Sequence, residues 1–163
     1  MTRLTILLLA ASLFAAAQPP STPAKSFIEQ FEDVNRRLLD MARDFPEAKY
    51  GYRATPEVRS FGDIIVHVAS GNAYAAKAGR GEKANWDEID PKGYTTKAAK
   101  VALLEKTIAD STAALKAIPD DRFAKTVQPW LAVIEHAGEH YGQLVVYYRN
   151  NGMVPPESRP KKK

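Results

Sequence analysis

Histidines are the residues of this chain whose type and spacing could do chemistry, and there are three of them. His136 and His140 are four residues apart, a spacing that puts two side chains on one helix face with about 5–6 Å between their Cβ atoms. At about 100° per residue, both fall in the apolar arc that holds Val133 and Leu144, so we expect them to point inward. A single metal ion can bridge two imidazoles placed in this way. His67 lies at the edge of the apolar face of an earlier predicted helix and can also turn inward.

The alternative to a metal site is three unrelated histidines in the core or on the surface. The spacing alone does not decide between the two. Asp63 precedes His67 by four residues and could approach a site there as a hydrogen-bond acceptor or base, or be a solvated charge on the helix surface. Tyr147 shares the face of His136 and His140, where it could line a pocket or pack in the core. Asp63 and Tyr147 are therefore candidate pocket residues.

Four stretches have the apolar periodicity of amphipathic helices, and none alternates with the period of a β-strand. We predict helices from Pro23 to Phe45, from Thr55-Pro56-Glu57 to Gly79, between Thr96 and Pro119, and from about Pro129 to Asn151. About ten residues connect the first two helices and about fifteen the next two, and long connections often cover a site. A polar connection through Asp120–Arg122 precedes the last helix. The predicted fold class is all-α, a four-helix bundle with long inter-helix connections.

The N-terminal residues have the pattern of a secretory signal peptide. Arg3 supplies a positive charge, and an apolar run from Leu4 to Ala17 ends in three alanines before Gln18-Pro19. The run is shorter than the roughly 20 residues of a membrane span. We therefore predict a signal peptide over residues 1–17, a helical domain over 22–157 and a disordered basic tail over 158–163. The mature protein is expected to be secreted or periplasmic, without stable membrane insertion after cleavage.

Charge and composition exclude several classes of function. Of 23 Lys and Arg residues, five lie at Arg3 and in the C-terminal tail, which leaves 18 against 19 Asp and Glu on the fold. A fold without a basic stripe is not expected to bind nucleic acid. The chain has no cysteine, which excludes disulfides, thiolate catalysis and cysteine zinc sites. Any metal would be held by His, Asp or Glu.

Two segments resemble motifs of the DinB-like (DinB/YfiT) proteins. Residues 139–156 (EHYGQLVVYYRNNGMVPP) are similar to the C-terminal motif of that family, and residues 59–67 (RSFGDIIVH) resemble its second-helix motif. The resemblance covers essentially the whole chain after the signal peptide. It implies a four-helix bundle, often a homodimer, in which one histidine of the second helix and two of the fourth bind a divalent metal. Carried over to this sequence, those ligands are His67, His136 and His140.

Three neutral imidazoles leave positions open on a metal ion, which is typical of a catalytic site, and water or substrate would occupy them. Ligation by imidazole without sulfur favours Zn or Ni, with Cu, Fe and Co also open. We therefore expect an exported DinB-like protein that acts as a divalent-metal-dependent hydrolase or transferase on a small-molecule substrate. The alternative is a non-catalytic exported bundle that binds a metal or is stabilised by one.

The segment His136-Ala137-Gly138-Glu139-His140 also matches the H-x-x-E-H pattern of inverzincin metallopeptidases, in which the glutamate is the general base. Those enzymes need a third, carboxylate ligand well downstream. Glu157 is the only acid after His140, and it lies beyond the end of the predicted helix. We therefore interpret Glu139 as a helix-surface charge or at most a neighbour of the metal ligands, and we do not expect peptidase chemistry.

Overall fold

The computed structural model describes residues 22–160 of the chain, and these form five α-helices and three short 3₁₀ helices without any β-strand. The α-helices are α1 (Pro23–Asp44), α2 (Phe61–Gly79), α3 (Lys97–Lys116), α4 (Asp120–Thr126) and α5 (Gln128–Asn150). The 3₁₀ helices are η1 (Glu47–Lys49), η2 (Pro91–Gly93) and η3 (Pro156–Ser158). The predicted signal peptide and the last three residues of the predicted tail lie outside the described residues. No helix within 22–160 has both the length and the apolar character that crossing a membrane requires.

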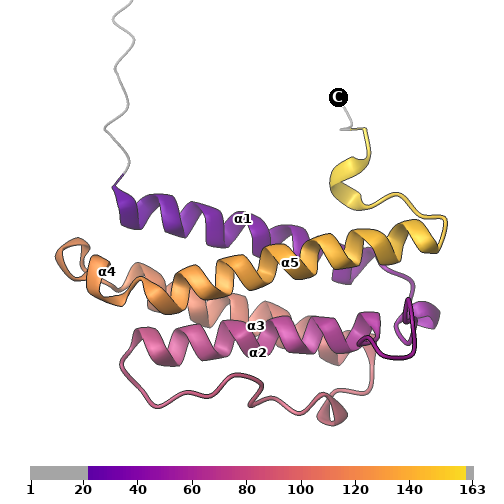
Figure 1. Ribbon diagram of the computed structural model, residues 1–163, viewed down its shortest axis with the longest axis horizontal. Helices are drawn as coiled ribbons and strands as arrows, with labels where there is room; N and C mark the ends of the chain where they lie inside the picture. Colours follow the sequence, from indigo (N-terminus) through magenta and orange to yellow (C-terminus); the bar gives the residue numbers. More distant parts are fainter. Residues whose placement is uncertain (1–21, 161–163) are drawn as a thin grey trace, which may run out of the picture.

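The four long helices surround a common core. α2 packs against α3 and α5, and α1 packs against the same two helices (Figure 1). The largest fully buried side chains come from all four: Trp130, Tyr147, Tyr148, Phe31, Phe45, Phe61, Leu38, Met41, Ile64, Ile65, Leu104 and Leu115. The connection from Arg80 to Thr96 runs back along the outside of α2 (Figure 1). The all-α prediction is confirmed for the described part of the chain.

Helix ends agree with the sequence where it offers a single capping signal. Thr22 caps α1, and its Oγ1 accepts a hydrogen bond from the amide of Lys25 at 3.2 Å, with Pro23 as the first helical residue. Thr96 caps α3 in the same way, through the amide of Ala99 at 3.1 Å. The predicted bounds of these two helices and of α5 are confirmed to within two residues.

The predicted start of the second helix at Thr55-Pro56-Glu57 is wrong. α2 begins at Phe61, because Ser60 is its N-cap and accepts a hydrogen bond from the amide of Asp63 at 3.2 Å. The amides of Phe61 and Gly62 donate instead to the carbonyl oxygens of Tyr52 and Tyr50, each at 2.9 Å. These bonds fix the chain that enters α2, and the Thr55–Val58 segment forms a turn before it.

A fifth helix replaces the polar connection expected through Asp120–Arg122. α4 begins after Pro119, and Asp120 and Asp121 in its first turn interact favourably with the helix dipole. Phe123 anchors this helix: it is buried and lies edge-on to Phe27 of α1, with 5.2 Å between ring centroids. The sequence between Pro119 and Pro129 is too short for an amphipathic pattern to be distinguished from a loop.

After α5, the chain stays in contact with the fold over more residues than the sequence predicted. η3 contacts α1, and the Arg159 guanidinium binds both carboxylate oxygens of Asp44, at 2.8 and 2.5 Å. Ser158 and Arg159, assigned to a disordered tail from composition, therefore lie against α1 in the structure.

Candidate metal centre

The three histidines lie together at the contact between α2 and α5. Each offers a ring nitrogen within 4.8 Å of the nitrogens of the other two, and the ring centroids are 4.4–4.9 Å apart. The closest approach is between Nε2 of His136 and Nε2 of His67, at 2.9 Å. His136 and His140 share one face of α5, as the spacing predicts, and α2 brings His67 to the same point.

Hydrogen bonds orient two of the three rings. Nδ1 of His67 lies 2.5 Å from Oδ1 of Asp87, and Nδ1 of His140 lies 2.8 Å from Oε1 of Gln143. A carboxylate and an amide oxygen only accept, so both Nδ1 atoms carry a hydrogen, and in the neutral ring Nε2 then keeps a lone pair. Nδ1 of His136 is buried and has no hydrogen-bond partner among the described residues.

Gln143 is itself held in place by a further pair of hydrogen bonds. Its Nε2 donates to the hydroxyl of Tyr147 at 3.3 Å, and that hydroxyl donates to the carbonyl oxygen of Arg59 at 2.7 Å. Arg59 lies immediately before the N-cap of α2. The chain of contacts therefore connects the ring of His140 on α5 to the segment that begins α2.

Burial keeps the two histidines of α5 neutral. It lowers the pKa of His136 to about 3, and the neighbouring His140 and His67 add to the effect. Burial also lowers the pKa of His140, opposed in part by the hydrogen bond to Gln143. At neutral pH these rings are therefore lone-pair donors, which is the form that binds a metal.

The described residues fit a divalent metal ion. The donor set is three imidazoles from two packed helices, and Nε2 of His136 faces Nε2 of His67 at 2.9 Å. Imidazole nitrogen suits Zn and Ni among the common divalent ions. His67, His136 and His140 are the residues that would hold it.

Close packing around His136 depends on Gly71, one turn after His67 on α2. A Cβ atom at this position would lie 3.2 Å from Nδ1 of His136 and 3.2 Å from Cζ2 of Trp86. The ring of Trp86 lies edge-on to that of His136 with 5.0 Å between centroids, and it contacts Tyr74 at 4.6 Å. Trp86 therefore forms an apolar wall beside the cluster.

The two candidate pocket residues have different surroundings. Asp63 lines a cavity of about 420 Å³ together with Arg59, His67 and Asp87. Its carboxylate pairs with Arg53 at 3.0 Å and Lys100 at 3.8 Å, and neither partner is a histidine. Tyr147 is buried in the core and acts on the cluster only through Gln143.

Asp87, Gln143 and Trp86 also contact the histidines, and none of the three was predicted from the sequence. Gln143 follows His140 by three residues, so its position on the same helix face could have indicated the contact. Asp87 and Trp86 lie in the connection from Arg80 to Thr96, which has no periodicity from which a side-chain direction could be derived.

A comparison with known protein families matches residues 30–144 to the DinB superfamily. The chain belongs to this superfamily. The matched range contains all three histidines together with Asp87 and Gln143. No protein with a curated description matches the chain.

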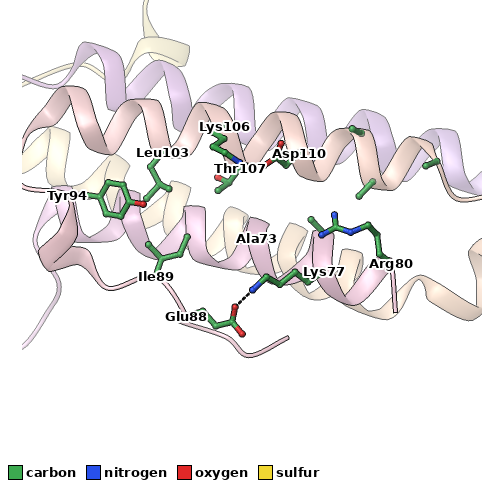
Figure 2. Close-up of a pocket in the computed structure, with 14 residues that line it drawn as sticks. Ala73, Lys77, Arg80, Glu88, Ile89, Tyr94, Leu103, Lys106, Thr107 and Asp110 are labelled. Carbon is green, nitrogen blue, oxygen red and sulfur yellow. Dashed lines mark hydrogen bonds and ion pairs between the residues drawn. The ribbon is translucent and has the colours of Figure 1, made fainter. Parts of the chain in front are cut away.

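A larger cavity in this DinB superfamily member, of about 760 Å³, lies between α2 and α3 (Figure 2). Alanines and Leu103 form much of its lining, and none of the three histidines borders it. The charged groups at its edge are paired: Lys77 with Glu88, Lys106 with Asp110, and Arg80 with Glu82 outside the lining. This cavity is therefore separate from the candidate metal centre.

Proposed function

We propose that this DinB superfamily protein binds one divalent metal ion, Zn or Ni, through His67, His136 and His140, and that it is a hydrolase or transferase for a small molecule. The observation that carries the proposal is the convergence of three imidazoles within 4.8 Å on two packed helices. Two of them are held neutral by burial, and hydrogen bonds to Asp87 and Gln143 direct two Nε2 lone pairs into the cluster.

A metal ion with three protein ligands supplies an electrophile that polarises a carbonyl or phosphoryl oxygen and lowers the pKa of a water ligand. Trp86 forms an apolar wall on one side of the three-histidine cluster, because its ring lies against that of His136. On the other side the cavity of about 420 Å³ gives a small solute access to His67. Arg59 at the edge of this cavity is half-exposed and pairs with Asp87 only at 3.7 Å, so its guanidinium can also reach an anionic group of a substrate.

Access from solvent favours a catalytic site over a structural one. A structural metal site is closed by four protein ligands, whereas the described cluster offers three and borders a cavity. A small molecule is the substrate class that fits a cavity of this size. We propose no role for nucleic acid, because the charge balance of the fold is close to zero.

Export and self-association are further parts of the proposal. The basic start and the apolar run up to Ala17 support export to the periplasm or the medium, and mass measurement of native protein should find the first 17 or so residues removed. The family resemblance supports a homodimer, which light scattering of the purified protein tests.

The metal content of untagged protein tests the proposed function. Wild-type protein should carry close to one divalent ion per chain, and each of His67→Ala, His136→Ala and His140→Ala should lose it. Glu139→Ala is a matched control, because Glu139 is exposed on the same helix beside His140 and should leave the ion in place. Wild-type protein that contains no metal and takes up neither Zn nor Ni would contradict the proposal. Loss of metal from Glu139→Ala would show instead that metal retention is not specific to the three histidines.

A further inference from the structure

We infer that Asp87 is the positioning residue of the three-histidine site: its carboxylate holds His67 in the one tautomer whose Nε2 lone pair faces the cluster. The inference rests on the proposed function, since the direction of that lone pair matters to a bound cation. It concerns a residue of the long α2–α3 connection, outside both sequence motifs that indicate the family.

The hydrogen bond itself sets the tautomer. Oδ1 of Asp87 lies 2.5 Å from Nδ1 of His67, and an ionised carboxylate can only accept, so the ring hydrogen is on Nδ1. In the neutral ring, Nε2 of His67 then presents a lone pair toward His136, whose Nε2 is 2.9 Å away. The opposite tautomer would put a hydrogen at that point and block ligation. Carboxylates that receive the second N–H of a metal-binding histidine commonly fix its orientation in this way.

The backbone of Asp87 is held in an unfavourable conformation to make this contact. Its φ is +60°, and within residues 22–160 it is the only residue other than glycine with a positive φ. Such conformations persist where several contacts of the surrounding structure hold them in place. Residues 86–89 meet this condition, because all four contact α2 or the cluster.

Contacts on each side of Asp87 attach the connection to α2. Trp86 packs on Tyr74 and His136, Glu88 forms an ion pair with Lys77, and the amide of Ile89 donates to Oγ of Ser70 at 3.3 Å. Asp87 lies between these attachments, so its carboxylate reaches the ring of His67 in a fixed geometry.

An ion pair with Arg59 is the competing explanation for Asp87, and the distances favour His67. Arg59 approaches Oδ2 at 3.7 Å and is half-exposed, whereas His67 is 11% exposed and lies at 2.5 Å. Asp90, three residues further on, caps the amide of Lys92 at 2.9 Å and is not hydrogen-bonded to any histidine. It provides a matched control in the same connection.

The test compares Asp87→Gly, Asp87→Asn and Asp90→Asn with untagged wild-type protein. Glycine accepts a positive φ and removes the carboxylate, whereas asparagine tolerates that φ and keeps a neutral acceptor oxygen. Asparagine at position 90 keeps the cap on Lys92. Nitrogen-15 NMR of the metal-free proteins reads the tautomer of His67 directly, and with three histidines in the chain the signals can be assigned by substitution. Competition with a chromophoric chelator then gives the affinity for Co²⁺.

Asp87→Gly should move the hydrogen of His67 to Nε2 in much of the population and weaken Co²⁺ binding about 10- to 100-fold. Asp87→Asn should restore the Nδ1–H tautomer and most of the affinity, and Asp90→Asn should match wild type. An unchanged tautomer and affinity in Asp87→Gly would overturn the inference, as would an equal loss in Asp90→Asn. Wild-type protein that binds no Co²⁺ would contradict the proposed function instead, and the tautomer comparison would still decide whether Asp87 directs His67.

Discussion

Nε2 of His136 lies 2.9 Å from Nε2 of His67, although the two residues are 69 positions apart and lie on different helices. Two imidazole nitrogens at this distance can both bind a single cation that lies between them. A proton on His136 is disfavoured, because burial lowers its pKa to about 3. At neutral pH His136 therefore keeps one ring nitrogen with a lone pair, the form that binds a metal ion.

Gly71→Ala should weaken metal binding, because the added Cβ atom would lie 3.2 Å from Nδ1 of His136 and displace its ring. Gly142→Ala is the control: no atom lies within 4 Å of a Cβ atom there, and it should leave binding unchanged. Alanine within a helix favours folding by about 0.5–1 kcal/mol over glycine, so Gly142→Ala should gain that amount and Gly71→Ala less. Chelator competition and thermal unfolding measure the two effects. Equal metal affinity in both variants would show that packing at Gly71 does not position His136.

Metal-free protein should lose stability as the pH falls below the ordinary histidine pKa of about 6.5. The pKa of His136 is lowered to about 3 in the fold, so between these values the unfolded chain binds a proton that the folded chain does not. The free energy of unfolding therefore decreases with decreasing pH in this window. Above this pH window neither the folded nor the unfolded chain binds the proton, so His136 no longer makes the free energy of unfolding depend on pH.

Urea denaturation of chelator-treated wild type and His136→Gln, at about pH 7 and about pH 4.5, checks this pH dependence. The decrease in unfolding free energy should be larger in wild type, because glutamine does not titrate. His140 remains in both proteins, so its own lowered pKa contributes equally to each. The same decrease in both proteins would contradict a buried, neutral His136.

Helical periodicity predicted the site on α5 better than the site on α2. His136 and His140 needed only the four-residue repeat of one helix, and the structure agrees. The start of α2 could not be predicted, because Thr55-Pro56 and Ser60 are both acceptable helix starts. Hydrogen bonds to the carbonyl oxygens of Tyr50 and Tyr52 decide where the helix starts, and these are contacts between segments.

The part of the site in the α2–α3 connection could not be predicted for a different reason. The length of the connection indicated a covered site, but Asp87 reaches His67 through a positive φ, and aspartate does not require one. Its position follows from the attachments of Trp86, Glu88 and Ile89 to α2. Each of these is a tertiary contact with no signature in the local sequence.

Arg159→Ala should lower the free energy of unfolding at neutral pH by a small amount, because Arg159 binds both oxygens of the Asp44 carboxylate in an exposed ion pair. The hydrogen bonds from Arg159 lower the pKa of Asp44 below its ordinary value of 3.8. The stabilisation is therefore complete above that value and is lost as the pH falls through the lower pKa of the folded state. Urea denaturation at about pH 7 and about pH 2.5 should show a larger difference from wild type at the higher pH.

Deletion of Lys161–Lys163 is the control for this effect, since it keeps Arg159 and should leave stability unchanged. Deletion from Arg159 onward should reproduce the loss seen in Arg159→Ala. If both deletions were neutral, the contact between Arg159 and Asp44 would contribute nothing to the stability of the fold.

Anomalous diffraction from crystals of the Zn-loaded, untagged protein tests the metal centre most directly. A difference map from data on the two sides of the zinc absorption edge should contain one strong peak per chain, in contact with His67, His136 and His140 at about 2.0–2.1 Å from each ligand nitrogen. A map without a peak at these three rings, or with its peaks only at surface carboxylates, would contradict the account.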